Sequence, residues 1–375
     1  MKIAILTLTL DYNYGGILQA YALQYVLRNA GHQVEHLQTR VETGPFHPKW
    51  LMPIVWCKRI IRKFCLGEKK LPIFRNPHKW IRENTAEFIK NNISVRFISH
   101  TEWMNVNSCD YDYIIVGSDQ VWRPKYAYPI ERYFLDFLDG SIIKVAYAAS
   151  FGTECNEFSQ EAQIRCAELI SQFRAVSVRE KSGIELCRKL FNVEAVNVLD
   201  PTLLLDQKVY MGLLSKTSTH PICGELMCYF LDPDVNSDIL ISKVSSILNF
   251  RPFNANSKIE LPDADIVEKY HPKVEQWIRG FYEANFIITD SFHACVFSII
   301  FKKNFIVYAN NSRGITRLES LLHTLNMTQR IVSSMDDFEN RKDALLLPIN
   351  YNEIEPLIER ERAKSYSFLE KCGLC

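Results

Sequence analysis

The stretch from Ile287 to Phe301 most constrains the fold, because it changes from a strand pattern to a helix pattern within three polar residues. Its first residues are apolar, as in a strand buried on both faces of a parallel sheet. Thr289, Asp290 and Ser291 follow, and either of the last two suits a helix N-cap. Apolar residues then recur at helical spacing. The pattern predicts an open α/β sheet in which a strand leads directly into a helix.

His293 falls in the first turn of this expected helix. A helix N-terminus at the carboxyl end of a parallel strand binds anions, and histidine exchanges protons near neutral pH. We therefore interpret His293 as a functional residue. The alternative is a core histidine that bonds to a backbone carbonyl, and the strand-turn-helix context favours function.

The size and charge of the chain bound its class. At 375 residues it is expected to form two domains. Its 44 basic and 43 acidic residues leave a net charge of +1, which gives no reason to expect a nucleic acid partner. The first ten residues have the pattern of a strand and not of a signal peptide, and no stretch of 18 apolar residues predicts a membrane span. These features predict a cytoplasmic protein.

The eleven cysteines are scattered, mostly within apolar runs, as buried thiols in a reducing compartment would be. Cys372 and Cys375 form the one close pair, and a single pair without a second one is a weak signal for metal binding or redox chemistry. We expect no metal and no cofactor.

The N-terminal region has the order of a Rossmann-like unit. A strand is expected from Ile3 to Leu10 and a helix from Ile17 to Asn29, with a glycine-bearing turn between them. Gly15 and Gly16 allow the backbone to approach a ligand closely, and Asn13 can donate and accept hydrogen bonds. Packing alone would explain the glycines equally well.

Residues 41–85 interrupt this pattern with five prolines and are interpreted as an insertion. Within it, residues 50–64 combine an apolar stripe with Lys58, Arg59, Arg62 and Lys63. Such a helix could rest on a membrane surface or cover an acceptor groove. The simpler interpretation is a solvated basic face.

Four further strands of the first region are expected to end in polar residues, which would converge on one edge of a sheet. One of these strands ends in Ser118, Asp119 and Gln120, and the next ends at Ser150. Arg179 ends a third, and Asp200 with Pro201 follows a fourth.

The periodicity lapses between Asp200 and Pro221, where we place a domain boundary. The predicted domains are residues 1–210, residues 211–350 with a second Rossmann-like series, and residues 351–375 as a helix that crosses back to the first domain. Two such domains imply a cleft between them.

Six short motifs, in order along almost the whole chain, resemble the polysaccharide pyruvyl transferase family. They are Asn13-Tyr-Gly-Gly16 with Gln19-Ala20, Val116-Gly-Ser-Asp-Gln-Val-Trp122, Ser177-Val-Arg-Glu180, Asp200-Pro-Thr202, Thr289-Asp-Ser-Phe-His293 and the segment from Arg313 to Arg330. The resemblance implies two Rossmann-like domains in the glycosyltransferase B (GT-B) architecture. It also implies transfer of the pyruvyl group of phosphoenolpyruvate onto sugar hydroxyls as a ketal, in surface or capsular polysaccharide synthesis.

Ketal formation from an enol phosphate needs an acid, a base and an anion clamp, which suggests roles for the candidates. His293 would be the acid or base, with Asp119 or Asp290 as partner carboxylate. Asp290 at a helix start would repel phosphate, so an N-cap or acceptor-side role suits it better. The donor-binding candidates are Arg179, Arg317, Arg313, Ser291 and Ser118. The cleft-loop candidates are Asn13, Gly15, Gly16, Gln120 and Ser150.

One position departs from the family pattern. Many members carry arginine two residues before the motif histidine, and this chain has Ser291 there. Arg313 or Arg317 could supply the missing cation, although helix arginines such as these and Arg330 usually lie on solvated faces.

Two other functions stay open at the level of sequence. The same cleft would serve a GT-B glycosyltransferase with a nucleotide-sugar donor. A non-catalytic saccharide-binding protein is the other alternative, and it predicts that the polar strand ends do not converge. The sequence also leaves open whether the acceptor is linked to a lipid and whether the protein works at the inner face of the membrane.

Overall fold

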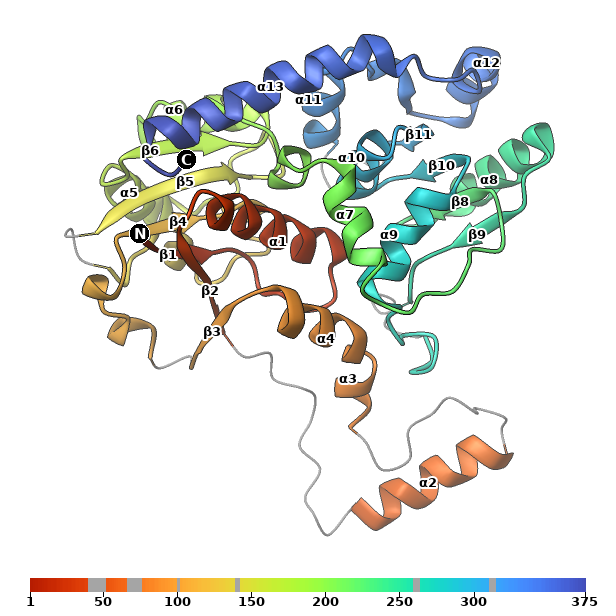
Figure 1. The fold of residues 1–375 in the computed structure, drawn as a ribbon, viewed down its shortest axis with the longest axis horizontal. Coiled ribbons are helices and arrows are strands. Elements are labelled where there is room, and N and C mark those ends of the chain that lie inside the picture. The colour runs from red at the N-terminus through yellow and green to blue at the C-terminus, as the bar shows by residue number, and fades with distance from the viewer. Residues whose placement is uncertain (40–51, 66–75, 100–101, 139–141, 259–263, 310–314) are drawn as a thin grey trace.

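The computed structural model describes residues 1–39, 52–65, 76–99, 102–138, 142–258, 264–309 and 315–375. Two parallel sheets with helices around them form two halves that lie side by side (Figure 1). In the described part of the chain, the first sheet has the order β3-β2-β1-β4-β5-β6-β7 and the second has the order β12-β11-β10-β8-β9.

The first sheet comprises β1 (Lys2–Leu6), β2 (Gln33–Thr39), β3 (Val95–Ile98), β4 (Tyr113–Val116), β5 (Ile143–Ala149), β6 (Ala175–Val178) and β7 (Val196–Asn197). The second comprises β8 (Leu226–Tyr229), β9 (Pro252–Asn254), β10 (Phe286–Thr289), β11 (Asn304–Tyr308) and β12 (Ile331–Val332).

The helices of the first half are α1 (Tyr14–Asn29), α2 (Met52–Cys65), α3 (Pro77–Trp80), α4 (Glu83–Asn92), α5 (Gln160–Ile170) and α6 (Lys181–Phe191). Those that follow are α7 (Gln207–Leu214), α8 (Val235–Leu248), α9 (Val274–Glu283), α10 (Phe292–Ile300), α11 (Thr316–Thr324), α12 (Met335–Leu345) and α13 (Tyr351–Lys371).

Each sheet reverses its strand order at one point, next to its central strand. In the first sheet β1 pairs with β2 on one side and with β4 on the other. In the second sheet β10 pairs with β8 and β11, and Thr289 is level with Tyr229 of β8. Open α/β sheets bind ligands beyond the carboxyl ends of strands at such a reversal. The sheet order therefore favours a ligand site among the residues that follow β1, β4, β8 and β10.

The long last helix, α13, crosses from the second half onto the first (Figure 1). The Ser365 hydroxyl accepts a hydrogen bond from the Leu199 amide at 2.9 Å, and the Tyr113 hydroxyl donates to the Cys372 carbonyl at 2.9 Å. This crossing, together with the two parallel sheets, confirms the predicted fold class. Cys372 is buried in this contact and Cys375 is exposed, and neither is in a disulfide.

One hydrophobic core spans both halves of the molecule and holds α1 against α9 and α10. Tyr14 of α1 lies 5.3 Å from Trp277 of α9, between ring centroids, and Trp277 lies 4.9 Å from Phe297 of α10. Large buried aromatic rings contribute much of the free energy of packing. The N-termini of α1 and α10 are consequently held close together.

The first strand, expected from Ile3 to Leu10, ends earlier, at Leu6. Two predictions about helices were also wrong. Helix α1 begins at Tyr14 and not at Ile17, because the Asn13 side chain caps it by accepting a hydrogen bond from the Gly16 amide at 3.1 Å. Residues 207–214, interpreted as an irregular boundary, form α7, whose N-cap Asp206 accepts from the Lys208 amide at 2.7 Å. In both cases a capping side chain starts a helix that the apolar periodicity alone did not indicate.

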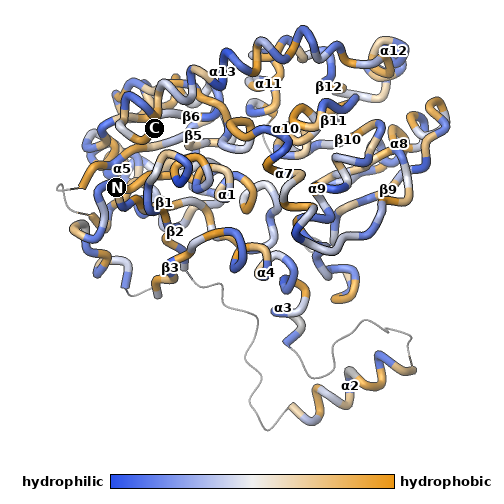
Figure 2. The backbone as a smooth tube through the Cα atoms, viewed as in Figure 1, coloured by the Kyte–Doolittle hydropathy of each residue, from blue (hydrophilic) through white to orange (hydrophobic). Residues whose placement is uncertain are grey.

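Helix α2, within the predicted insertion, lies apart from both sheets (Figure 1) and carries hydrophobic and hydrophilic residues interspersed along its length (Figure 2). Arg62 of α2 pairs with Asp265 at 2.6 Å.

Candidate active site

The histidine identified from the sequence lies where the two halves meet. Ser291 is the N-cap of α10 and its hydroxyl accepts from the Ala294 amide at 3.5 Å, so His293 stands in the first turn, as predicted. A Cβ atom added to Gly15 would lie 2.0 Å from Nδ1 of His293. The start of α1 therefore touches the imidazole, and only glycine at position 15 leaves room for it.

Asp200, expected as a strand end and as part of a family motif but not as a site residue, is the carboxylate nearest to the imidazole in the described part of the chain. Its Oδ2 lies 3.5 Å from Nε2 of His293 and accepts hydrogen bonds from Ser118 Oγ at 3.0 Å and Arg179 Nη1 at 2.7 Å. Its Oδ1 accepts from the amide and hydroxyl of Thr202. Burial opposes ionisation of Asp200, but the neighbouring His293, Arg179 and Thr202 outweigh it and hold the carboxyl pKa well below its usual value.

Two arginines from different halves share one aromatic ring. The guanidinium carbon of Arg179 lies 4.4 Å from the ring centroid of Phe292, and that of Arg317 lies 5.6 Å from it. Both arginines are buried. Burial, and next the positive charge of Arg179, lower the pKa of Arg317 to about 10. The positive charges of the two buried guanidinium groups repel each other. An anion bound beside them would relieve that repulsion.

Asp119 approaches the same cluster from the end of β4. Its Oδ1 lies 3.7 Å from Arg179 Nη2 and accepts a hydrogen bond from the Gln120 amide at 2.9 Å. A Cβ atom at Gly16 would lie 3.3 Å from its Oδ2. The backbone of Asp119 is left-handed, with φ of 87°, a conformation that costs free energy for a residue with a side chain. Asp119 therefore joins Arg179 to the start of α1.

The loops after β4, β5 and β6 support one another through a buried carboxylate. Glu180 Oε1 accepts from the Ser150 hydroxyl at 3.0 Å and from the amides of Phe151 and Gly152. The Gln120 side chain lies against Gly152, where a Cβ atom would be 2.0 Å from its Oε1. Gln120 and Ser150, both predicted as cleft residues, thus brace the loops that carry Asp119 and Arg179.

Asp290 has a different environment from His293. Its two carboxylate oxygens accept hydrogen bonds from the amides of Leu231 at 2.8 Å and Asp232 at 3.0 Å. It therefore fixes the loop after β8 at the reversal point of the second sheet. The N-cap of α10 is Ser291 and not Asp290.

Arg330 of the motif set does not extend the cluster. Arg330 is buried and not on a solvated face, and its Nη1 donates to the Leu345 carbonyl at 2.7 Å. Arg313 lies outside the described residues. Of the described arginines in this set, Arg317 is the one that lies beside Phe292 with Arg179.

The polar strand ends therefore converge on His293, against the expectation for a non-catalytic binding protein. A crevice beside Arg179, Asp200 and Phe292 holds only about 10 Å³, so a ligand that binds there must displace side chains. Within the described part of the chain, no group of three or more His, Cys, Asp or Glu side chains is placed to hold a metal ion.

With this geometry the chain can be compared with known proteins. A family model described as polysaccharide pyruvyl transferase matches residues 13–312, which include Asn13, Arg179, Asp200 and His293. The chain belongs to this family. No curated protein matches it.

Solved structures with the same fold are distant in sequence from this pyruvyl transferase family member. The structure titled UDP-GlcNAc 2-epimerase from Neisseria meningitidis bound to UDP-GlcNAc has a TM-score of 0.52 at 11% identity, covering 99% of this chain and 100% of that one. Arabidopsis thaliana UGT89C1 complexed with UDP-L-rhamnose has a TM-score of 0.51 at 10% identity, covering 99% and 98%. At these identities the likeness shows the GT-B architecture alone.

Proposed function

We propose that this pyruvyl transferase moves the pyruvyl group of phosphoenolpyruvate onto two hydroxyls of a sugar as a ketal, in the synthesis of a surface or capsular polysaccharide. The observation that carries the proposal is the buried pair Arg179 and Arg317, both beside the ring of Phe292 and next to His293. Phosphoenolpyruvate carries its phosphate and its carboxylate on the same carbon, C2, and two guanidinium groups can bind both.

The reaction requires proton transfers that the cluster can supply. A proton goes to the methylene carbon C3 of the donor, C2 becomes electron-poor, and one sugar hydroxyl forms a C–O bond to C2 as it loses its proton. The C2–O bond to phosphate breaks with its electron pair, and a second hydroxyl forms the second C–O bond. One hydroxyl proton balances the proton added at C3, and the other leaves with phosphate.

In this scheme His293 donates or accepts the transferred proton, and Asp200 stabilises the charged imidazole. The pKa of Asp200, held well below its usual value, keeps this carboxylate negative throughout. Arg179 and Arg317 balance the charge that develops on the departing phosphate. Asp119 stands between Arg179 and the start of α1, on the side from which a sugar hydroxyl would approach.

The composition of helix α2 supports a location of the enzyme at a membrane surface. It contains no acidic residue, and Ile54, Ile61 and Phe64 are exposed on it. A basic amphipathic helix of this kind binds at the headgroup level of a negatively charged bilayer. The described helices include none that is long and apolar enough to cross a membrane. Our proposal therefore places the enzyme on the inner face, with an acceptor glycan that is linked to a lipid.

Thermal unfolding of the purified protein with phosphoenolpyruvate, UDP, GDP or a nucleotide sugar tests the donor. A ligand at about 100 times its dissociation constant adds roughly 2.7 kcal/mol to the free energy of unfolding, which should raise the midpoint by about a degree or more. We expect the rise with phosphoenolpyruvate and its loss in Arg317→Gln. A rise with a nucleotide sugar and none with phosphoenolpyruvate would instead support the GT-B glycosyltransferase function.

A further inference from the structure

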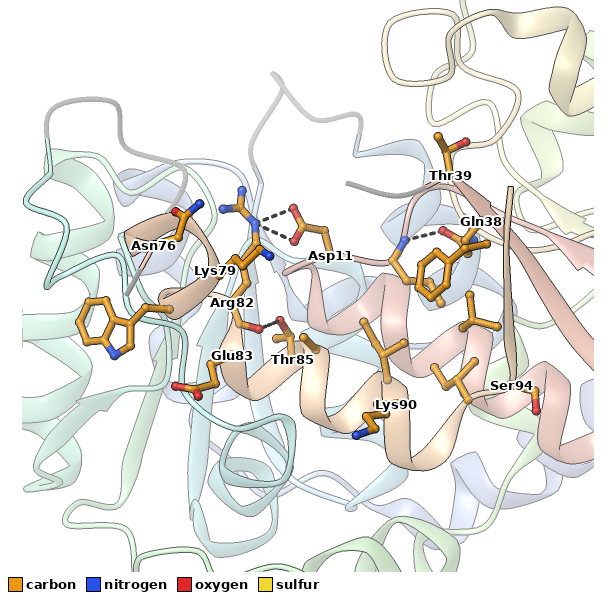
Figure 3. Close-up of a pocket in the computed structure, with 17 residues that line it drawn as sticks. Asp11, Gln38, Thr39, Asn76, Lys79, Arg82, Glu83, Thr85, Lys90 and Ser94 are labelled. Atoms are coloured by element: carbon orange, nitrogen blue, oxygen red, sulfur yellow. Dashed lines mark hydrogen bonds and ion pairs between the residues drawn. The ribbon is translucent and has the colours of Figure 1, made fainter. Parts of the chain in front are cut away.

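A large cavity lies away from His293, in the first half of the molecule. It has a volume of about 1000 Å³ and runs along α4, between α3 and the ends of β2 and β3 (Figure 3). This volume is at the upper end of the range for ligand sites. A cavity of this volume can hold a ligand.

One end of the cavity is aliphatic. Ile89 and Ile93 come from the last turn of α4 and the residue after it, and Val95 and Phe97 come from the edge strand β3. The side chain of Phe97 is 54% exposed although it lines the cavity. An exposed apolar surface of this kind fits an aliphatic chain better than a sugar ring.

The other end carries charges of both signs. Lys79 and Arg82 lie here, at the α3 end of the cavity, with Asp11 beside them (Figure 3). Arg82 pairs with Asp11 at 2.7 Å, whereas Lys79 is exposed at the rim, close to Glu83. Lys90 adds a third cation to the lining, in the last turn of α4 next to Ile89. With three cations against two carboxylates the lining has an excess positive charge of one, which suits an anionic head group such as a phosphate.

The charged end of the cavity is close along the chain to a residue that touches His293. Asp11 lies two residues before Asn13, the N-cap of α1, and Gly15 in the first turn of α1 touches the imidazole. The loop from Leu10 to Asn13 therefore borders the cavity on one side and the His293 cluster on the other. A ligand with its phosphate near Lys79 could extend over this loop and present a sugar to His293.

Helix α2, which precedes α3 in the chain, also has a composition that suits a lipid surface. Its exposed Ile54, Ile61 and Phe64 and its lack of acidic residues suit a lipid surface, and α3 contributes Lys79 to the cavity rim. A membrane-bound α2 would keep the cavity close to the bilayer from which a lipid-linked ligand comes.

We propose that this cavity binds the aliphatic chain and the phosphate of a lipid-phosphate-linked saccharide, with the saccharide extending past Asp11 to His293. The identity of the saccharide as acceptor rests on the proposed pyruvyl transfer. The binding site itself does not rest on pyruvyl transfer, since its own apolar and charged walls define it.

Isothermal titration of the full chain with farnesyl phosphate tests the site without turnover. We expect saturable binding that is at least 10-fold weaker in Phe97→Asp, and unchanged in the matched control Ile164→Asp on α5, whose side chain is 58% exposed outside the cavity. Lys79→Glu should weaken binding of farnesyl phosphate and leave binding of farnesol unchanged. Absence of farnesyl phosphate binding, or equal binding by Phe97→Asp, would overturn the proposal.

Two further binding measurements distinguish other ligands of the cavity. Gln38 lines the cavity, and its buried Nε2 has no hydrogen-bond partner among the described residues, so a soluble oligosaccharide is a fair competitor. Binding of a lipid-free glycan that is lost in Phe97→Asp, without binding of farnesyl phosphate, would make this a sugar site and overturn our assignment. Displacement of farnesyl phosphate by an equal concentration of lysophosphatidylglycerol would assign the cavity to membrane phospholipid instead.

Lipid binding in the cavity and pyruvyl transfer at His293 can be tested separately. Farnesyl phosphate binding with no midpoint rise from phosphoenolpyruvate would support the cavity assignment while removing pyruvyl transfer. A midpoint rise from phosphoenolpyruvate without farnesyl phosphate binding would keep pyruvyl transfer and overturn the cavity assignment.

Discussion

Nε2 of His293 lies 3.5 Å from Oδ2 of Asp200, and the two residues come from different halves of the molecule. Asp200 follows the last strand of the first sheet, and His293 follows the central strand of the second. The same carboxylate oxygen accepts a hydrogen bond from Arg179, so the proton-transfer and anion-binding groups share one buried anchor. Small relative movements of the two halves would therefore change both functions together.

Replacement of His293 by alanine should lower turnover of phosphoenolpyruvate with a competent acceptor by about 10²-fold or more, because general acid-base catalysis contributes that much. Steady-state release of phosphate measures it. His220→Ala, on an exposed residue, is the control and should keep full turnover. If His293→Ala keeps near full turnover, the imidazole has no part in proton transfer.

Asp200→Asn should destabilise the fold, because it leaves the buried Arg179 without the charge it pairs with at 2.7 Å. Breaking one side of a buried ion pair costs roughly 3–5 kcal/mol. Urea unfolding measures the loss, and Asp206→Asn, at the exposed N-cap of α7, should cost about 1 kcal/mol or less. A loss for Asp200→Asn as small as that of the control would mean that the ion pair contributes little.

Gly15→Ala should lower turnover and stability together, because the new Cβ atom would stand 2.0 Å from the His293 ring and push it aside. Overpacking of this kind costs about 1–3 kcal/mol. The matched control is Gly212→Ala in α7, where no atom lies within 4 Å of the added Cβ, and it should stabilise the protein by about 0.5–1 kcal/mol. Parallel thermal unfolding and phosphate release separate the two effects, and normal activity in Gly15→Ala would disprove the close contact.

The pH dependence of stability should show two acid phases. Burial lowers the pKa of His36 and of His271 to about 4, so between pH 6.5 and 4 the unfolded chain binds more protons than the folded one. Stability is full above the unfolded value and falls as the pH drops through this window, by up to about 1.4 kcal/mol per pH unit and histidine.

The second phase belongs to Asp200, whose folded pKa lies well below its ordinary value of 3.8. Its contribution is present above about pH 4 and is lost as the pH falls further towards the folded pKa. Urea midpoints between pH 7 and pH 2 measure both phases. Asp200→Asn should keep the first phase and lose most of the second, and an identical profile for the variant would contradict the assignment.

Local chemistry made the position of His293 predictable. A polar residue that can cap a helix, placed between a buried apolar run and an apolar stripe of helical period, specifies a strand, a turn and a first helical turn within 15 neighbouring residues. The same reasoning found the ends of β4, β5 and β6, since each ends where apolar residues give way to polar ones. It missed α7 and misplaced the start of α1, where a single side-chain cap outweighed a weak periodic pattern.

The sequence by itself therefore determined the strands, most helices and the residue types that reach the sheet edges, because those depend on contacts between near neighbours. Only the tertiary structure decided which of these residues meet. Asp200 lies 93 positions before His293, and Arg317 shares the ring of Phe292 with Arg179, which precedes it by 138 positions. Such pairings depend on how the aromatic core seats α1 against α9 and α10, and no local pattern records that packing.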